Sequence, residues 1–169
     1  MSKLNLSFYL TGGTALGRFY LHHRWSDDLD FFTNSSPEFS LEIKEVNQKI
    51  LSRFDRDSNS EIVSEDFYRT FLHHGSLTLK LEFVNDVAHY TGDVHSIRGI
   101  RVDNLKNILC NKLTALLGRD EPKDVFDILF ISLNYSFNWK EIFAESKEKS
   151  LMNEIDIIQR LEFFSDRVF

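Results

Sequence analysis

The alternation of hydrophobic and polar residues predicts four strands in the first half of the chain. An apolar run at 4–10 ends at two glycines, as a buried strand does where it enters a turn. The acidic run at 26–32 places Ser26, Asp28 and Asp30 on one side and Leu29 and Phe31 on the other. Runs at 67–74 and 76–84 lie on either side of Gly75, so we expect a hairpin with one buried face. In the last run the two faces are Leu77, Leu79, Leu81 and Phe83 against Thr78, Lys80, Glu82 and Val84.

Helical spacing of the apolar residues predicts the other elements. One helix is expected at 14–23, where Gly13 or Thr14 would be the N-cap, and another at 38–54, followed by a polar loop at 55–61. From residue 103 onward the pattern is helical throughout. It predicts one helix at 103–117, one that begins at Pro122, and two more at 139–147 and 151–164.

These elements predict an α+β fold. A small mixed sheet with flanking helices forms a core at 1–100, and a helical C-terminal region at 101–169 packs on it as one compact unit. The 169 residues suffice for one hydrophobic core without disulfides or metals. A hydrophobic content of 42%, including 16 phenylalanines, excludes disorder as the default state and predicts a Phe-rich core.

Composition also limits where the protein is expected in the cell and which partners it is expected to bind. Cys110 is the single cysteine, so no internal disulfide forms, and the N-terminus does not resemble a signal peptide; we therefore expect a cytoplasmic protein. No apolar run reaches the length of a membrane span, so no membrane partner is expected. The formal net charge of −6 argues against indiscriminate nucleic-acid binding, although a local basic pocket would still bind phosphates.

Paired carboxylates are the first candidate chemistry. Asp28 and Asp30, two apart on a strand, project from one face and could share one cation or a pair of cations. A solvated strand end explains such a pair as well, since two close carboxylates repel each other unless a cation or water compensates. Glu82 is the best third acid and Asp86 the reserve, while an exposed Lys80–Glu82 pair is the alternative for that strand.

Two further motifs point to an anion. Gly12 and Gly13 let backbone N–H groups approach a phosphate closely, although a simple tight turn also explains them, and the Lys-Ser/Thr ending of a P-loop is missing. Lys112 falls within the apolar stripe of its helix and needs an anion, unless its ammonium reaches water along the surface. The next helix carries Asp124 and Asp127 on one face, so a lysine held there would be well placed for a triphosphate.

Taken together, these residues resemble the AbiEii/AbiGii-type nucleotidyltransferase toxins, a family of the DNA-polymerase-beta-like nucleotidyltransferase superfamily. The resemblance covers about Phe8 to Leu133. It is carried by Gly12-Gly13-Thr14-Ala15-Leu16, Arg24-x-Ser26-x-Asp28-Leu29-Asp30-Phe31, Lys80-x-Glu82-Phe83, the segment from Lys112 to Arg119, and Lys123-Asp124-x-x-Asp127.

The resemblance implies a nucleotidyltransferase fold with a metal-dependent site. Asp28, Asp30 and Glu82 would hold two magnesium ions (Mg²⁺, with Mn²⁺ as an alternative), and Glu82 would help to activate the attacking hydroxyl group. Lys112 and Asp124 would also be catalytic. The residues implied in binding the NTP substrate are Gly12, Gly13, Thr14, Arg24, Ser26, Lys80, Arg119 and Asp127.

The implied activity is transfer of a nucleoside monophosphate from an NTP to an RNA, such as tRNA, or to a protein. The implied role is that of a toxin of an abortive-infection or toxin–antitoxin system, with an antitoxin protein as partner. Because the chain begins only a few residues before the glycine turn, we expect acceptor binding to be reduced or supplied by a partner. The third acid is glutamate where many relatives have aspartate, and this makes Glu82 the least secure of the three.

Two alternatives stay open at the level of sequence. One is a catalytically silent nucleotide-binding or regulatory module that acts through a protein partner. The other is an interaction protein that uses a Phe-rich surface. The Asp28 and Asp30 pair favours an enzyme over the silent module, whereas the short segment before the glycine turn keeps the module open.

Overall fold

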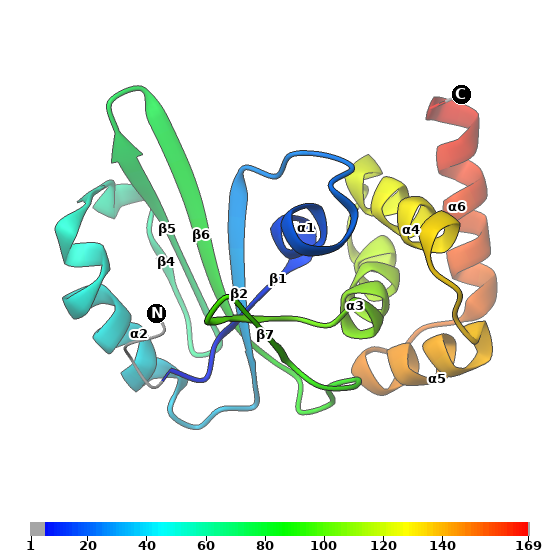
Figure 1. Cartoon of the computed structure of the whole chain (residues 1–169), viewed down its shortest axis with the longest axis horizontal. Helices are drawn as coiled ribbons and strands as arrows, with labels where there is room; N and C mark the ends of the chain where they lie inside the picture. Colours follow the sequence, from blue (N-terminus) through cyan, green and yellow to red (C-terminus); the bar gives the residue numbers. More distant parts are fainter. Residues whose placement is uncertain (1–5, 169) are drawn as a thin grey trace.

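A computed structural model describes residues 6–168 and shows one mixed sheet with helices on both faces (Figure 1). The strands are β1 (Tyr9–Thr11), β2 (Asp28–Asn34), β3 (Asp55–Arg56), β4 (Ile62–Val63), β5 (Phe67–His74), β6 (Leu77–Asp86), β7 (His95–Ile97) and β8 (Ile100–Val102). The helices are α1 (Gly12–Ala15), α2 (Phe39–Lys49), α3 (Leu105–Gly118), α4 (Pro122–Asn134), α5 (Trp139–Lys149) and α6 (Glu154–Val168). No helix in the described part is long and apolar enough to cross a membrane.

The sheet is mixed, as predicted. Its strand order is β3-β5-β6-β2-β1-β8-β7, with β4 paired to β5 at one edge. The pairs β2–β6 and β1–β8 are parallel, whereas β1–β2, β5–β6 and β7–β8 are antiparallel. Strand β2 therefore lies in the middle of the sheet, between β1 and the β5–β6 hairpin.

Helices divide the molecule into two apolar layers. Helix α2 covers one face of the sheet, α1 and α3 lie on the other, and α4 to α6 pack beyond α3 (Figure 1). The layer under α2 is rich in phenylalanine, as predicted: the Phe83 ring lies 5.1 Å from that of Phe8 and 5.2 Å from that of Phe31. The layer on the α3 side is mainly aliphatic, and Ile108, Leu109 and Leu113 belong to it.

The hairpin prediction is confirmed. Leu81 and Phe83 are buried on the face of β6 that turns to α2. Leu77 is 70% exposed, because the tip of the hairpin extends beyond the helix that covers this face. Lys80 and Glu82 lie on the opposite face.

The predicted start of the first helix was wrong. The helix begins at Gly12, where φ is +67°, and its N-cap is Thr11, whose side chain makes no capping hydrogen bond. Thr14 is not a cap, because its hydroxyl group donates a hydrogen bond to the carbonyl oxygen of Asp28. After one turn the chain continues as a π-helix over Leu16–Leu21.

Other boundaries also differ from the prediction. The long helix expected after Glu38 ends at Lys49, and a 3₁₀ helix at Leu51–Arg53 follows it. The loop expected at 55–61 begins with β3, and the pair β7–β8 was not predicted. These strands have two or three residues each, too few to show an alternation. Residues Leu4 and Asn5 of the first predicted strand lie outside the described residues.

Candidate active site

Parallel pairing of β2 and β6 brings the predicted carboxylates together. In the register of the two strands Asp28 faces Lys80 and Asp30 faces Glu82. Asp28, Asp30 and Glu82 line one cavity of about 200 Å³. The other residues that line it are Gly13, Arg24, Trp25, Ser26, Asp27, Lys80, Lys112, Arg119 and Lys123. The cavity therefore contains all three predicted acids and most of the predicted phosphate ligands.

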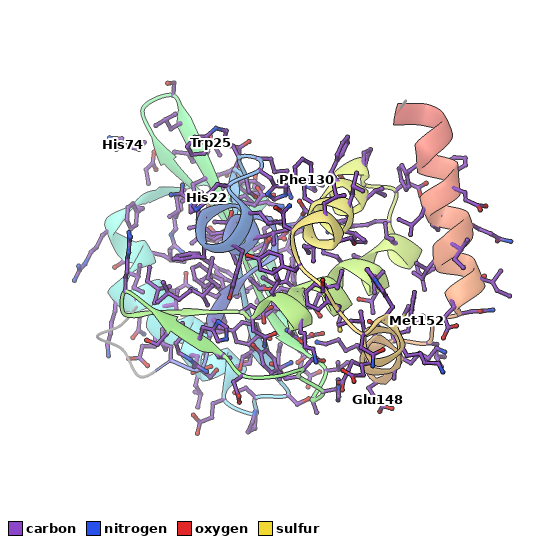
Figure 2. The ribbon with its side chains drawn as sticks, turned by 45° about the vertical axis from the view of Figure 1, so that its right-hand side comes forward. His22, Trp25, His74, Phe130, Glu148 and Met152 are labelled. Carbon is purple, nitrogen blue, oxygen red and sulfur yellow. The ribbon has the colours of Figure 1, made fainter. Side chains whose placement is uncertain are left out.

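The cavity opens at one end of the molecule. Trp25 is 85% exposed and lies at its rim. Figure 2 shows Trp25 at the same end as His74, which belongs to the tip of the β5–β6 hairpin. A substrate larger than a nucleotide can therefore approach the cavity from this end.

Two cations compensate the acids within the sheet. The Lys80 ammonium lies 3.0 Å from Oδ2 of Asp28 and 3.5 Å from Oε1 of Glu82. Arg69 Nε donates a 2.6 Å hydrogen bond to Glu82. The sequence analysis missed Arg69, although its position on the polar face of β5, directly opposite Glu82, follows once the hairpin register is known.

Asp30 is the least compensated of the three acids. Its burial, and then the negative charge of Glu82, raise the pKa of Asp30 to about 6, while Lys80 acts in the opposite direction. At neutral pH the cavity therefore holds an ionised Asp30 at a cost in free energy. An additional cation beside it would lower that cost.

The chemistry of these donors fits a hard divalent cation. Three carboxylates from two adjacent strands supply the oxygen ligands that Mg²⁺ prefers. Because burial and then the charge of Glu82 raise the pKa of Asp30, a cation bound beside it would stabilise its ionised form. Among residues 6–168, however, no three acidic, His or Cys side chains are arranged so that they could hold a metal ion. The Lys80 ammonium instead contacts both Asp28 and Glu82.

The glycine turn brings backbone against the acids and the cations. A Cβ atom at Gly12 would lie 2.5 Å from Oδ2 of Asp30, in a conformation with positive φ. A Cβ atom at Gly13 would lie 2.5 Å from Nη2 of Arg24 and 3.1 Å from Oγ of Ser26. The positive φ of Gly12 favours glycine there, and beside Gly13 the Arg24 side chain is held by Asp127, so a Cβ atom is disfavoured at both positions. The backbone at Gly13 forms part of the wall of this cavity.

A buried charge network holds the cationic wall in place. Lys112 Nζ lies 2.6 Å from Asp124 Oδ1 and 2.7 Å from Asp127 Oδ2. Arg24 donates two 2.6 Å hydrogen bonds to Asp127, from Nε and Nη2. Arg119 Nε donates one of 2.7 Å to Asp124. Both aspartates are fully buried, so they lie behind the cavity and position the three cations that line it.

The two aspartates are strongly acidic despite their burial. Burial raises the pKa of Asp127, but the hydrogen bond from Arg24 and the charge of Lys112 outweigh it and lower the pKa to about 2. Asp124 follows the same pattern, with Arg119 and Lys112 lowering its pKa.

His23 also contacts this network. Its Nε2 atom lies 2.8 Å from Asp127, and its side chain is 2% exposed. The sequence analysis gave His23 no role, because its partner is far along the chain and on another helix.

Solved structures share this fold. JHP933 of Helicobacter pylori is 20% identical, with a TM-score of 0.60 over 97% of this chain and 86% of that one. MenT4, a nucleotidyltransferase toxin of Mycobacterium tuberculosis H37Rv, is 14% identical, with a TM-score of 0.59 over 94% of this chain and 75% of that one. The mixed sheet and its flanking helices are thus a nucleotidyltransferase fold.

The family follows from the sequence itself. The family described as nucleotidyl transferase AbiEii toxin, type IV toxin–antitoxin system, matches residues 1–150. The chain therefore belongs to the AbiEii nucleotidyltransferase toxin family, which implies an NTP substrate and an antitoxin partner. Protein aq_aa25 of Aquifex aeolicus (strain VF5), described as uncharacterized, is 31% identical and matches 94% of this chain and 74% of its own length.

Asp127→Asn tests the buried network. The substitution removes the charge that compensates Lys112 and Arg24, so we expect the free energy of unfolding to fall by about 3 to 5 kcal/mol. Urea unfolding followed by circular dichroism measures this. Glu121→Gln is the matched control. It removes the exposed ion pair between Glu121 and Lys123, whose atoms are 3.9 Å apart, and should lower the free energy of unfolding by less than about 1 kcal/mol. Equal effects of the two substitutions would contradict the argument.

Asp30→Asn tests the electrostatic cost of the acid cluster. The pKa of Asp30 is about 6 in the folded chain, against an ordinary value of 3.8. A carboxyl group whose pKa is raised by folding favours the folded state at low pH and opposes it once both states are ionised. In magnesium-free buffer we therefore expect stabilisation on the order of 1 to 3 kcal/mol above pH ~7, shrinking as the pH falls from about 6 towards 4.

The measurement is thermal unfolding across this pH range in the presence of a chelator. Asp27→Asn, at an exposed neighbour that also lines the cavity, is the control and should show no such pH-dependent gain. An Asp30→Asn protein that is less stable than the unmodified protein at neutral pH would refute the electrostatic interpretation.

Proposed function

We propose that this protein is an Mg²⁺-dependent nucleotidyltransferase that moves a nucleoside monophosphate from an NTP to an RNA acceptor, with tRNA as one candidate. The observation that supports it best is the cavity itself. Asp28, Asp30 and Glu82 meet there with the glycine backbone and with a set of cations. Nucleotidyl transfer needs this combination, because charge has to be neutralised on both sides of the reacting phosphorus.

The metal ligands would be the three acids. Asp28, Asp30 and Glu82 would hold two Mg²⁺ ions, which supply positive charge to the phosphates and make the attacking hydroxyl group more acidic. The chain's own residues do the rest. Glu82, the acid nearest to the β5 side of the cavity, accepts the proton of the attacking hydroxyl group.

The cationic wall would bind the triphosphate. Arg24, Lys112 and Arg119 line the cavity, and their aspartate partners fix their position before the substrate arrives. Lys80 and the backbone at Gly13 complete the wall. Fixed cations stabilise the negative charge that develops on the departing pyrophosphate without further reorganisation.

The cellular role would be that of a cytoplasmic toxin in an abortive-infection or toxin–antitoxin system. Membership of the AbiEii toxin family supports this. Transfer of a nucleotide to an RNA needed for translation would arrest growth, and an antitoxin would counter it.

One observation favours a second candidate, a catalytically silent nucleotide-binding module. Lys80 lies between Asp28 and Glu82, where it supplies the positive charge that a metal ion would bring. A module of this kind would bind an NTP without Mg²⁺ and would form no product.

Asp28→Asn separates the two candidates. Purified protein is incubated with each labelled NTP, Mg²⁺ and total cellular RNA, and label in RNA and in protein is counted. For the enzyme we expect transfer by the unmodified protein and a loss of at least about 100-fold in Asp28→Asn, whose fold is checked by circular dichroism. Asp27→Asn, with its exposed side chain, should retain transfer.

Label in protein alone would identify a protein acceptor and refute RNA transfer. NTP binding without transfer, unchanged by a chelator, would establish the silent module.

A further inference from the structure

The face of the sheet that bears the acids continues into an apolar row. Two residues beyond Asp30 on β2 lies Phe32, and two residues beyond Glu82 on β6 lies Val84. In the register of the sheet Val84 lies between Phe32 of β2 and Phe67 of β5. We call Phe32, Val84 and Phe67 the apolar shelf. All three are half-buried, so they do not belong to the closed core.

The apolar shelf forms the floor of a second cavity of about 500 Å³. Helix α3 supplies the opposite wall through Asn111, Thr114, Ala115 and Gly118. The residues that line both cavities are Asp30, Glu82, Lys112 and Arg119. Two of the three candidate catalytic acids, Asp30 and Glu82, therefore lie at the boundary between the two cavities.

The two cavities differ in chemistry. The first is lined mainly by charged and polar groups, among them cations that suit phosphates. The second combines the apolar shelf with an amide, hydroxyl groups and charged side chains, which are those of Arg69, Asp86 and the four shared residues. Arg69 links the two surfaces, because its guanidinium lies 5.2 Å from the centre of the Phe67 ring and its Nε bonds to Glu82. Rings beside polar groups suit a nucleoside, which is flat and apolar on its faces and polar at its edge.

Asn111 gives a second, independent indication of a ligand. Its Nδ2 atom is buried and has no hydrogen-bond partner within residues 6–168. An unpaired buried amide costs free energy, so an acceptor atom from a ligand would offset that cost. Thr114, one turn further along α3, lines the same cavity.

The geometry of an in-line displacement at phosphorus indicates whether the donor or the acceptor nucleoside binds in the second cavity. In an in-line reaction the attacking oxygen and the leaving group lie on opposite sides of the phosphorus. With the triphosphate on the cationic wall, pyrophosphate leaves into the first cavity. The attacking hydroxyl group then comes from the opposite side of Asp30 and Glu82, where the second cavity lies.

We propose that the second cavity binds the terminal nucleoside of a single-stranded RNA acceptor, with its base on the apolar shelf and its ribose hydroxyl group toward Glu82. This inference rests on the proposed function. The ribose oxygen forms a bond to the α-phosphorus, and the bond from that phosphorus to the bridging oxygen breaks. Pyrophosphate leaves with the electron pair, and Glu82 takes the hydroxyl proton.

Phe67→Leu tests the shelf, because it removes the ring and keeps an apolar side chain. We expect the affinity for a short fluorescein-labelled single-stranded oligoribonucleotide, measured by anisotropy, to fall about 5- to 30-fold. The affinity for each common NTP, measured by calorimetry, should change less than about twofold, since the phosphates bind elsewhere. Phe54→Leu is the matched control: Phe54 is 50% exposed, does not line the second cavity, and its substitution should change neither affinity.

Asn111→Leu provides a second variant. It removes the unpaired amide, so the free protein should be at least as stable as the unmodified one, while RNA affinity falls about 3- to 10-fold. A merely structural Asn111 would not show both effects.

The alternatives have distinct outcomes. Weaker NTP binding in Phe67→Leu with RNA binding unchanged would assign the cavity to the donor nucleoside and overturn the inference. Unchanged binding of both, or no RNA binding by the unmodified protein, would also overturn it. Transfer of label by the unmodified protein, lost in Asp28→Asn, would show in the same preparation that the proposed function holds even where this inference fails.

Discussion

The site depends on two fully buried aspartates that hold three cations. Asp127 binds Arg24 and Lys112, and Asp124 binds Lys112 and Arg119, so the loop before β2 is tied to α3 and α4. Buried ion pairs add little net stability, because desolvation consumes most of the attraction, but they fix geometry. Here they fix cations against a cavity before any phosphate arrives, and three cations against two anions leave positive charge for a ligand.

The opposite wall of the cavity has the reverse balance. The sheet contributes the three acids Asp28, Asp30 and Glu82 against the two cations Lys80 and Arg69, and burial and then the charge of Glu82 raise the pKa of Asp30. Two walls of opposite charge suit a ligand that carries both signs, and an NTP with bound Mg²⁺ is such a ligand. The backbone of the glycine turn runs between the two walls. A Cβ atom at Gly12 would lie against Asp30 of the acidic wall, and one at Gly13 against Arg24 of the cationic wall.

The sequence predicts the parts of this arrangement that depend on local periodicity. Alternation alone places Asp28 and Asp30 on one face and Glu82 opposite to Phe83, and helical spacing places Lys112 in a buried stripe. Pairing between distant segments leaves no such signal. That Asp30 lies beside Glu82, and that His23 reaches Asp127, depends on strand register and helix packing across 52 and 104 residues of separation. The helix start at Gly12 escaped prediction for a related reason, because neither the positive φ of Gly12 nor the closeness of Asp30 to it leaves a local signal in the sequence.

Val84 is an apolar exception on the polar face of β6, and its neighbours give this exception a meaning. On the polar face of β6 it follows Lys80 and Glu82, and a valine at this place has no role in a solvated face. In the sheet it is flanked by Phe32 and Phe67, so three strands change from charged to apolar at the same level. A nucleotide also changes from charged phosphates to an apolar base. Under the proposed assignment the reacting phosphorus lies at the boundary between the two surfaces, where Asp30 and Glu82 line both cavities.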